Sequence, residues 1–182
     1  MIHRLLTLPA MLLFLAACQS GALPRPGETL FEQLSGGEVT LHRDITIAPG
    51  QVRITFQEGA AGYGASEYKP RCELEVRDIL ATPQTIPAGS YRIGKVRGMQ
   101  RYVGRPAESI MLAAVGDTIR LADDTSDEWY MYTYRMQLLN KQQADAAMLV
   151  CGGAYNFAFY ARYPTLQEMR EALGDYATLS LD

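Results

Sequence analysis

Apolar and polar residues alternate along much of the chain from residue 39 onward, and such alternation predicts β-strands with one buried face. The first two alternating stretches cover residues 39–47 and 52–56, with Pro49-Gly50 between them. Proline and glycine supply the backbone angles of tight turns, so the two stretches are predicted to form a β-hairpin.

The same alternation recurs through the rest of the chain. A long hairpin is predicted from residues 128–140 and 146–153. Seven or eight short strands within about 125 residues are typical of an antiparallel β-sandwich or a small barrel, so the fold class is predicted to be mainly β. The other predicted strands cover residues 72–78, 90–98, 117–123 and 154–163.

Near the C-terminus the pattern changes to a helical one. Thr165 and Glu168 have the spacing of a capping box, and Gly174 follows where a left-handed helix end is expected. We therefore predict a short C-terminal α-helix that packs on the β core, and a helical turn at residues 29–34. The apolar stripe of the C-terminal helix consists of Leu166, Met169 and Leu173.

Two stretches, residues 46–54 and 85–93, share the pattern T-I-x-x-G-x-x-R-I at identical spacing. The pattern predicts the same kind of hairpin twice, with Arg53 and Arg92 pointing outward between inward-facing apolar residues. Duplication and convergence explain the match equally well, so it indicates strand boundaries only.

The start of the chain has the three parts of an export signal: the positive charge of Arg4, an apolar stretch at residues 5–15, and small residues after it. A transmembrane helix needs roughly 20 consecutive apolar residues, and no later segment approaches that length without glycine or charge. The apolar stretch is therefore predicted to be a removable signal.

This signal ends in Leu15-Ala16-Ala17-Cys18. The sequence resembles the lipobox of bacterial lipoproteins, and the resemblance is confined to this N-terminal segment. It implies that residues 1–17 are removed and that Cys18 carries a diacylglyceryl group on its sulfur and an acyl group on its amine. Several acyl chains give stable anchoring, since each buried methylene contributes about 0.8 kcal/mol.

Residue 19 is glutamine, not the aspartate that retains enterobacterial lipoproteins in the inner membrane. The resemblance therefore implies an address at the periplasmic face of the outer membrane. Residues 18–28 are short, polar and rich in proline and glycine, and are predicted to form a lipidated tether that reaches about 30 Å. Residues 29–182 are predicted to form a single β-rich domain.

The composition narrows the range of partners. The chain has 17 basic and 20 acidic side chains, a net charge of −3, and loss of the signal with Arg4 makes the charge about −4. This mild acidity argues against nucleic acid and against polybasic attachment to anionic lipid. The membrane is expected to be contacted through the lipid on Cys18.

With one of the three cysteines lipidated, Cys72 and Cys151 remain as an even pair in an oxidising compartment. We predict that they form a structural disulfide, which would contribute at most roughly 4 to 5 kcal/mol by closing a loop of about 80 residues. Cys72 is expected to face the core, with Glu73, Glu75 and Arg77 on the opposite face of its strand.

Few residues suggest catalysis. The mature chain has one histidine, His42, on the polar face of its strand, which disfavours histidine-based nucleophilic sites and zinc or copper sites. Four acidic residues between positions 123 and 128 lack the ligand spacing of an EF-hand, so we interpret them as a solvated turn. No metal and no cofactor are expected. The row of Tyr130, Tyr132 and Tyr134 is interpreted as packing.

Two segments are candidates for binding a partner. The first is the glycine-rich loop at residues 57–71, which contains Tyr63 and Tyr68. The second is a basic segment in an otherwise acidic protein, where arginine and tyrosine together suit anionic groups, glycans or a protein hot spot. Its candidate residues are Tyr91, Arg92, Lys95, Arg97, Arg101, Tyr102 and Arg105.

The sequence therefore favours a membrane-anchored periplasmic lipoprotein that is not an enzyme and that binds another envelope component, a protein or a glycan. The alternative is a cell-wall or glycan hydrolase, which needs two convergent carboxyl groups about 5 to 9 Å apart. A deep, aromatic-lined pocket around Glu73, Glu75, Asp123 or Asp127 would favour the hydrolase.

Overall fold

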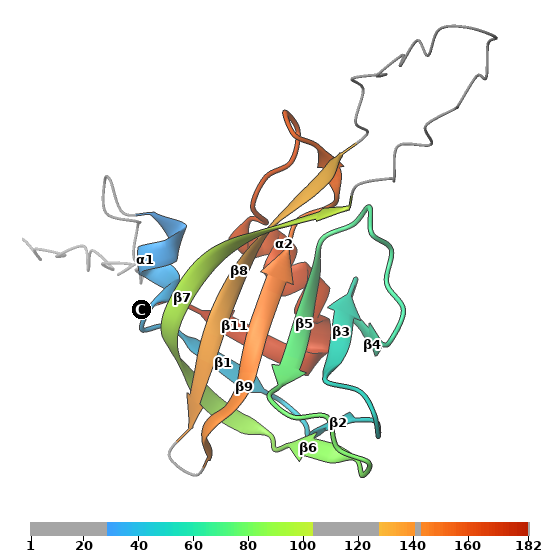
Figure 1. The fold of residues 1–182 in the computed structure, drawn as a ribbon. Helices are drawn as coiled ribbons and strands as arrows, with labels where there is room; N and C mark the ends of the chain where they lie inside the picture. The colour runs from blue at the N-terminus through green and yellow to red at the C-terminus, as the bar shows by residue number, and fades with distance from the viewer. Residues whose placement is uncertain (1–28, 104–127, 141–142, 182) are drawn as a thin grey trace, which may run out of the picture.

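The computed structural model of the chain describes residues 29–103, 128–140 and 143–181. Several features predicted from the sequence lie outside these residues: the signal and Cys18, the tether, the strand at residues 117–123, Arg105 and the aspartates of the acidic cluster. The domain itself is built around an antiparallel sheet (Figure 1).

The prediction of a mainly β fold with a short C-terminal helix is confirmed. Nine of the strands form one sheet in the order β11-β1-β7-β8-β9-β5-β3-β4, with β10 paired to β8, and β2 and β6 form a separate pair. In chain order the elements are α1 Leu30–Leu34, β1 Glu38–Leu41, β2 Ile45–Ile47, β3 Arg53–Gln57, β4 Ala60–Gly62, β5 Arg71–Val76, β6 Gln84–Ile86, β7 Gly89–Val103, β8 Trp129–Asn140, β9 Gln143–Gly152, β10 Asn156–Phe157, α2 Leu166–Leu173, the 3-10 turn Gly174–Tyr176 and β11 Ala177–Ser180.

The large sheet curls into a half-barrel, and the core lies on its inner face (Figure 1). Helix α2 contacts β3 and β5 near one end of the strand order and β11 at the other end. Its buried residues are Met169, Ala172 and Leu173, which belong to the same core cluster as Leu74 of β5 and Leu179 of β11. The helix therefore closes the open side of the curled sheet.

The predicted hairpin between residues 39–47 and 52–56 is wrong. Strand β2 pairs with β6, while β3 pairs with β4 and β5. The chain turns a corner between β2 and β3 because Gly50 has a φ of 73°, and the equivalent Gly89 has a φ of 140°. The two similar stretches are thus corners between strands of different sheets, and their first strands pair with each other, with Thr46 opposite Thr85.

Two further strands differ from the prediction. The long hairpin of β8 and β9 is confirmed, but the strand predicted at residues 154–163 is reduced to the two residues of β10. After Phe157 the chain turns, since the backbone N–H groups of Tyr160 and Ala161 both donate to its carbonyl oxygen. Strand β11 was not predicted, because four residues that follow a helix directly give too short an alternating pattern.

Both predicted helices are present, and the predicted caps hold α2 in place. The backbone N–H of Glu168 donates to the Thr165 hydroxyl at 3.2 Å, and Glu168 Oε2 accepts from the Thr165 N–H at 2.8 Å. Gly174 ends the helix with a φ of 50°. A Cβ atom at Gly174 would lie 2.5 Å from the Cα of Gly59, so the glycine lets the helix end approach the turn between β3 and β4.

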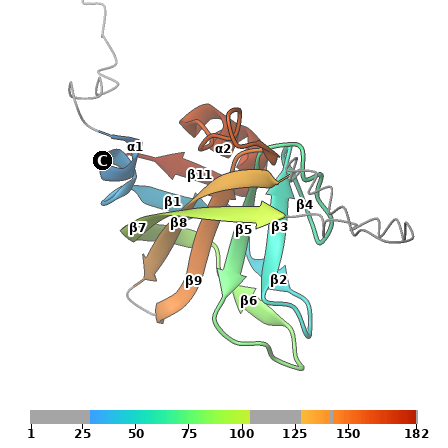
Figure 2. The ribbon, with the colours of Figure 1, turned by 45° about the horizontal axis from the view of Figure 1, so that its top comes forward.

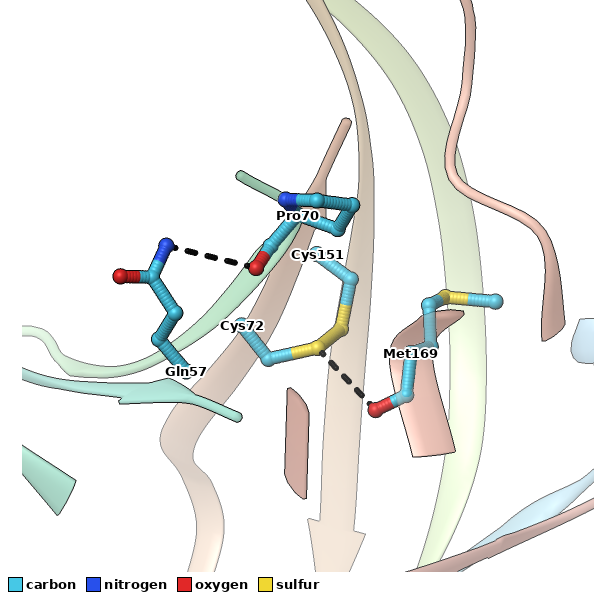
Figure 3. Close-up of a disulfide and its surroundings, with 5 residues drawn as sticks. All are labelled: Gln57, Pro70, Cys72, Cys151 and Met169. Carbon is cyan, nitrogen blue, oxygen red and sulfur yellow. Dashed lines mark hydrogen bonds between the residues drawn. A yellow bond between two sulfur atoms is a disulfide. The ribbon is translucent and has the colours of Figure 1, made fainter. Parts of the chain in front are cut away.

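Cys72 and Cys151 are joined by a disulfide, as predicted (Figure 3). They lie directly opposite each other on β5 and β9, and both are completely buried. The sulfur of Cys72 lies 3.9 Å from the carbonyl oxygen of Met169 in α2. The disulfide therefore fixes two neighbouring strands at the place where the helix packs on the sheet.

Candidate functional site

The outer face of the sheet carries a cluster of arginines around two glutamates, here called the arginine cluster. Glu73 and Glu75 come from β5, where they alternate with the core residues Cys72 and Leu74. The arginines come from four different strands and converge on these carboxylates. They are Arg53 of β3, Arg71 of β5, Arg101 of β7 and Arg135 of β8.

Arg101 is the unexpected member, because β8 and β9 lie between its strand and β5 in the sheet. In a flat sheet β7 and β5 would be about 14 Å apart. Strand β9 ends at Gly152, opposite Thr133, but β7 and β8 continue together as far as Val103 and Trp129. Narrow ribbons twist more strongly than wide sheets, and this extension turns toward the start of β5 in both ribbon views (Figures 1 and 2).

The extension leaves side chains buried on the outer face of the sheet. Met131, Thr133 and Val150 are almost inaccessible, although they alternate with residues of the main core. The missing side chain of Gly152 creates the space that Met131 fills, since a Cβ atom there would lie 2.7 Å from the Met131 sulfur. Glu73 is opposite Val150 in the sheet and is buried with it.

Three arginines hold the carboxylate of Glu73. Its Oε2 atom lies 3.0 Å from Nη1 of Arg101 and 3.1 Å from Nη1 of Arg53. Its Oε1 atom accepts a hydrogen bond of 3.2 Å from Nε of Arg71. Burial alone would raise the pKa of Glu73, but the positive charges of Arg101 and Arg53 and the hydrogen bonds from Arg101 and Arg71 outweigh it and lower the pKa. Glu73 is therefore ionised at neutral pH.

Glu75 is held in a similar way at the more open side of the cluster. Its Oε2 atom lies 3.0 Å from Nη2 of Arg135, and its Oε1 atom lies 3.5 Å from Nη2 of Arg101 and 3.7 Å from Nη1 of Arg53. Arg53 and Arg101 thus bridge the two glutamates, which makes the cluster one connected network.

Four guanidinium groups face two carboxylates, so the arginine cluster has two positive charges in excess. The side chains of Arg53 and Arg135 are 47% and 35% exposed, whereas that of Arg71 is 10% exposed. Nη1 of Arg71 has no hydrogen-bond partner among the described residues, and the guanidinium lies 5.6 Å from the ring centre of Tyr155. The excess charge is therefore displayed mainly at Arg53 and Arg135.

Next to the cluster the surface is hollowed. A depression of about 320 Å³ has Glu75 and Arg135 at the cluster side. Its other lining residues are Val76, Arg77, Gln137, Ala147 and Met148, with no aromatic residue among them. Arg77 is exposed and adds a further positive charge to this part of the surface.

The predicted basic segment becomes strand β7, and its residues separate. Arg101 belongs to the cluster, and Arg97 is exposed opposite Arg135 on the same face of the sheet. Arg92 and Lys95 are exposed nearer the start of the strand, and Tyr102 is exposed near its end.

Tyr91 was predicted to contact a partner, but the structure places it in the core. It is 2% exposed, and its hydroxyl donates to the carbonyl oxygen of Pro87 at 2.7 Å. The physical reason is its place in the sheet. Tyr91 is paired with Val39 of β1, which is completely buried, and paired residues of neighbouring strands point to the same face of a sheet. Tyr91 is therefore removed from the candidate surface.

The glycine-rich loop at residues 57–71 has more structure than predicted. Its first part forms a tight hairpin of β3 and β4, and the Gln57 side chain holds the second part. The Gln57 side-chain NH₂ donates to the carbonyl oxygen of Pro70 (Figure 3) and to those of Ser66 and Lys69. The side-chain oxygen of Gln57 accepts from the Ser66 N–H at 2.8 Å. Tyr63 and Tyr68 remain exposed on this fixed loop.

The tyrosine row and His42 can also be placed in the structure. Tyr134 is buried and stacks on Tyr163 with ring centres 4.7 Å apart, and Tyr132 packs on the same ring, so this row is packing. His42 is exposed and shares a hydrogen bond with the hydroxyl of Thr178. Among the described residues there is no group of acidic, histidine or cysteine side chains that suits a metal ion.

Comparisons with known proteins found no match: no protein-family model, no curated protein and no solved structure resembles this chain. In the part of the chain that the structure describes, no helix has the length and apolar character needed to cross a membrane.

We predict that Glu73→Gln lowers the free energy of unfolding by about 3 kcal/mol at pH 7, because it leaves the buried guanidinium of Arg71 without its counter-charge. The pKa of Glu73 is lowered in the folded protein, so its stabilisation is present above the ordinary value of 4.5 and is lost as the pH falls below it. Urea denaturation at several pH values measures both effects.

Glu58→Gln is the matched control, because Glu58 forms an exposed ion pair with Lys69. We expect this control to change stability by less than about 1 kcal/mol. A difference between wild type and Glu73→Gln that stays constant from pH 7 to pH 3 would contradict the ionised state of Glu73.

Proposed function

We propose that this chain is a lipid-anchored envelope protein whose periplasmic domain binds an anionic component of the envelope through the arginine cluster, without catalysing a reaction. The anchor rests on the resemblance of residues 15–18 to a lipobox. The observation that supports binding is the excess positive charge on the outer face of the sheet, in a protein whose net charge is negative.

The geometry of the cluster suits recognition of a carboxylate or phosphate group. Guanidinium groups are planar, always charged, and able to donate two parallel hydrogen bonds to such groups. Glu73 and Glu75 hold the arginines in fixed positions, so little rotamer entropy is lost when a partner binds. Arg97 and Arg77 extend the positive surface beside the cluster, and both side chains are exposed.

The state of the carboxylates argues against the alternative, a glycan hydrolase. Such an enzyme needs one carboxyl group whose pKa is raised so that it can donate a proton to the leaving oxygen. The pKa of Glu73 is lowered instead, and each oxygen of Glu75 lies beside an arginine. The hollow beside Glu75 also lacks the aromatic lining that favours sugar binding.

We predict that the purified protein is retained on immobilised heparin at low salt despite its negative net charge, because the positive side chains are gathered on one face. Arg97→Glu should elute at a lower salt concentration than wild type. Arg97 lies beside the cluster but outside the ion pairs of Glu73, so this variant should fold normally. Gradient elution measures the difference.

Arg43→Glu makes the same change of charge elsewhere, where the guanidinium lies over the ring of Tyr176. We expect this control to elute close to wild type. Identical elution of Arg97→Glu and Arg43→Glu would show that overall charge, rather than the arginine cluster, governs retention.

A separate prediction tests the anchor. In a bacterial host, Cys18→Ser should accumulate as a precursor that keeps residues 1–17 and carries no acyl chains, because the acceptor sulfur is missing. Mass spectrometry of the intact protein measures both properties, with Ser20→Ala as the control that leaves Cys18 and the disulfide in place. Normal acylation of Cys18→Ser would contradict the lipoprotein assignment.

A further inference from the structure

One end of the domain carries exposed aromatic side chains that neither the core nor the arginine cluster uses. They come from the β4–β5 loop, the last residues of β7, the first residue of β8, and the segment that begins with β10. Phe159 is 99% exposed, Tyr160 72%, Tyr102 67% and Tyr68 66%. We call these exposed side chains, together with the half-buried Trp129 on which Tyr68 and Phe157 pack, the aromatic tip. It consists of Tyr68, Tyr102, Trp129, Phe157, Phe159 and Tyr160.

Three rings of the aromatic tip are in contact with one another. The ring of Trp129 lies 4.7 Å from that of Phe157 and 5.5 Å from that of Tyr68, measured between ring centres. Tyr102 lies on the neighbouring strand, with its ring 6.4 Å from that of Tyr130. Single exposed apolar residues are common on proteins, but several exposed rings gathered around a ring cluster mark an interaction surface.

The segment after β10 places the two most exposed rings at the edge of this surface. The backbone N–H groups of Tyr160 and Ala161 donate to the carbonyl oxygen of Phe157, each at 2.9 Å, so the chain is held in a turn. Phe159 lies within this turn with its ring almost entirely in solvent. Because the turn already orders the backbone that carries this ring, a partner that contacts the ring does not have to order that backbone on binding.

The position of the tether indicates what covers the aromatic tip. Helix α1 begins at Leu30, immediately after the tether of residues 18–28. Its Phe31 packs on Tyr163 with ring centres 5.3 Å apart, and Tyr163 packs on Tyr132 at 5.2 Å. Phe31 also lies beside Gly98 of β7, and that strand runs five residues further, roughly 17 Å, to its end at Val103 beside Trp129. A tether of about 30 Å therefore lets the tip reach the membrane that holds the lipid.

We propose that the aromatic tip inserts into the surface of the phospholipid bilayer to which Cys18 is anchored. Tryptophan and tyrosine favour the membrane interface, where the ring enters the acyl region and the polar group stays hydrated. The contact gives the tether a second attachment point and sets the orientation of the domain on the membrane. This inference rests on the lipid anchor of the proposed function, and it is independent of the arginine cluster.

The chain contains its own probe for a test, because Trp129 is its only tryptophan. The acylated full-length protein is reconstituted in phosphatidylcholine vesicles whose acyl chains carry bromine, which quenches fluorescence at short range. We expect a strong loss of Trp129 fluorescence relative to vesicles without bromine. High salt should leave this loss unchanged, because the contact is apolar and the lipid is uncharged.

The double variant Phe159→Ser with Tyr160→Ser should restore most of the fluorescence while the protein stays bound to the vesicles. Both side chains are exposed, so the substitutions should leave the fold intact. Ile79→Ser is the matched control, since Ile79 is 69% exposed and follows β5, whereas Tyr68 precedes that strand. It should be quenched as strongly as wild type.

The outcomes separate this inference from the lipid anchor. Protein that is acylated and bound to vesicles but shows no quenching of Trp129 would overturn the insertion of the aromatic tip and leave the anchor intact. Protein that carries no acyl group would overturn the anchor. Dimers in detergent that the double variant abolishes would indicate that a second copy covers the tip, and would also overturn the inference.

Discussion

The ion pair between Glu73 and Arg101 is the constraint on which the arrangement of the outer face depends. The two residues lie on strands separated by two others, and they meet because the ribbon of β7 and β8 twists toward β5 beyond the end of β9. The approach of this ribbon to β5 buries Glu73, and a buried carboxylate requires counter-charges. Arg53 and Arg71 supply them, so the shape of the sheet and the composition of the cluster determine each other.

On the inner face, a different set of contacts maintains the curl of the sheet. Helix α2 joins β3 and β5 to β11, and the disulfide between Cys72 and Cys151 fixes β5 to β9 beneath the helix. With both faces fixed, the arginine cluster and the aromatic tip are held on one rigid framework. In the proposed function, the tip and the lipid on Cys18 set how the domain lies on the membrane, which in turn determines where the cluster is presented to a partner.

The sequence predicted the features that depend on neighbouring residues. The capping box of α2, the left-handed Gly174, the hairpin of β8 and β9, and the inward-facing Cys72 all follow from local spacing. It failed where pairing is non-local, as in β2, which pairs with β6 across almost forty residues instead of with β3. The burial of Glu73 was missed for the same reason. Alternation placed Glu73 opposite the core, but only the tertiary fold brings Arg101 to it, and no spacing in the sequence indicates that contact.

A double-mutant cycle on Glu73 and Arg101 tests this account most directly. Urea denaturation at pH 7 of wild type, Glu73→Gln, Arg101→Gln and the double variant gives the free energy of coupling between the two side chains. The structure predicts a coupling of about 1.5 to 3 kcal/mol, as expected for a partly buried, charge-assisted hydrogen bond. Additive effects, with a coupling below about 0.5 kcal/mol, would contradict the claim that this pair holds the β7–β8 ribbon against β5.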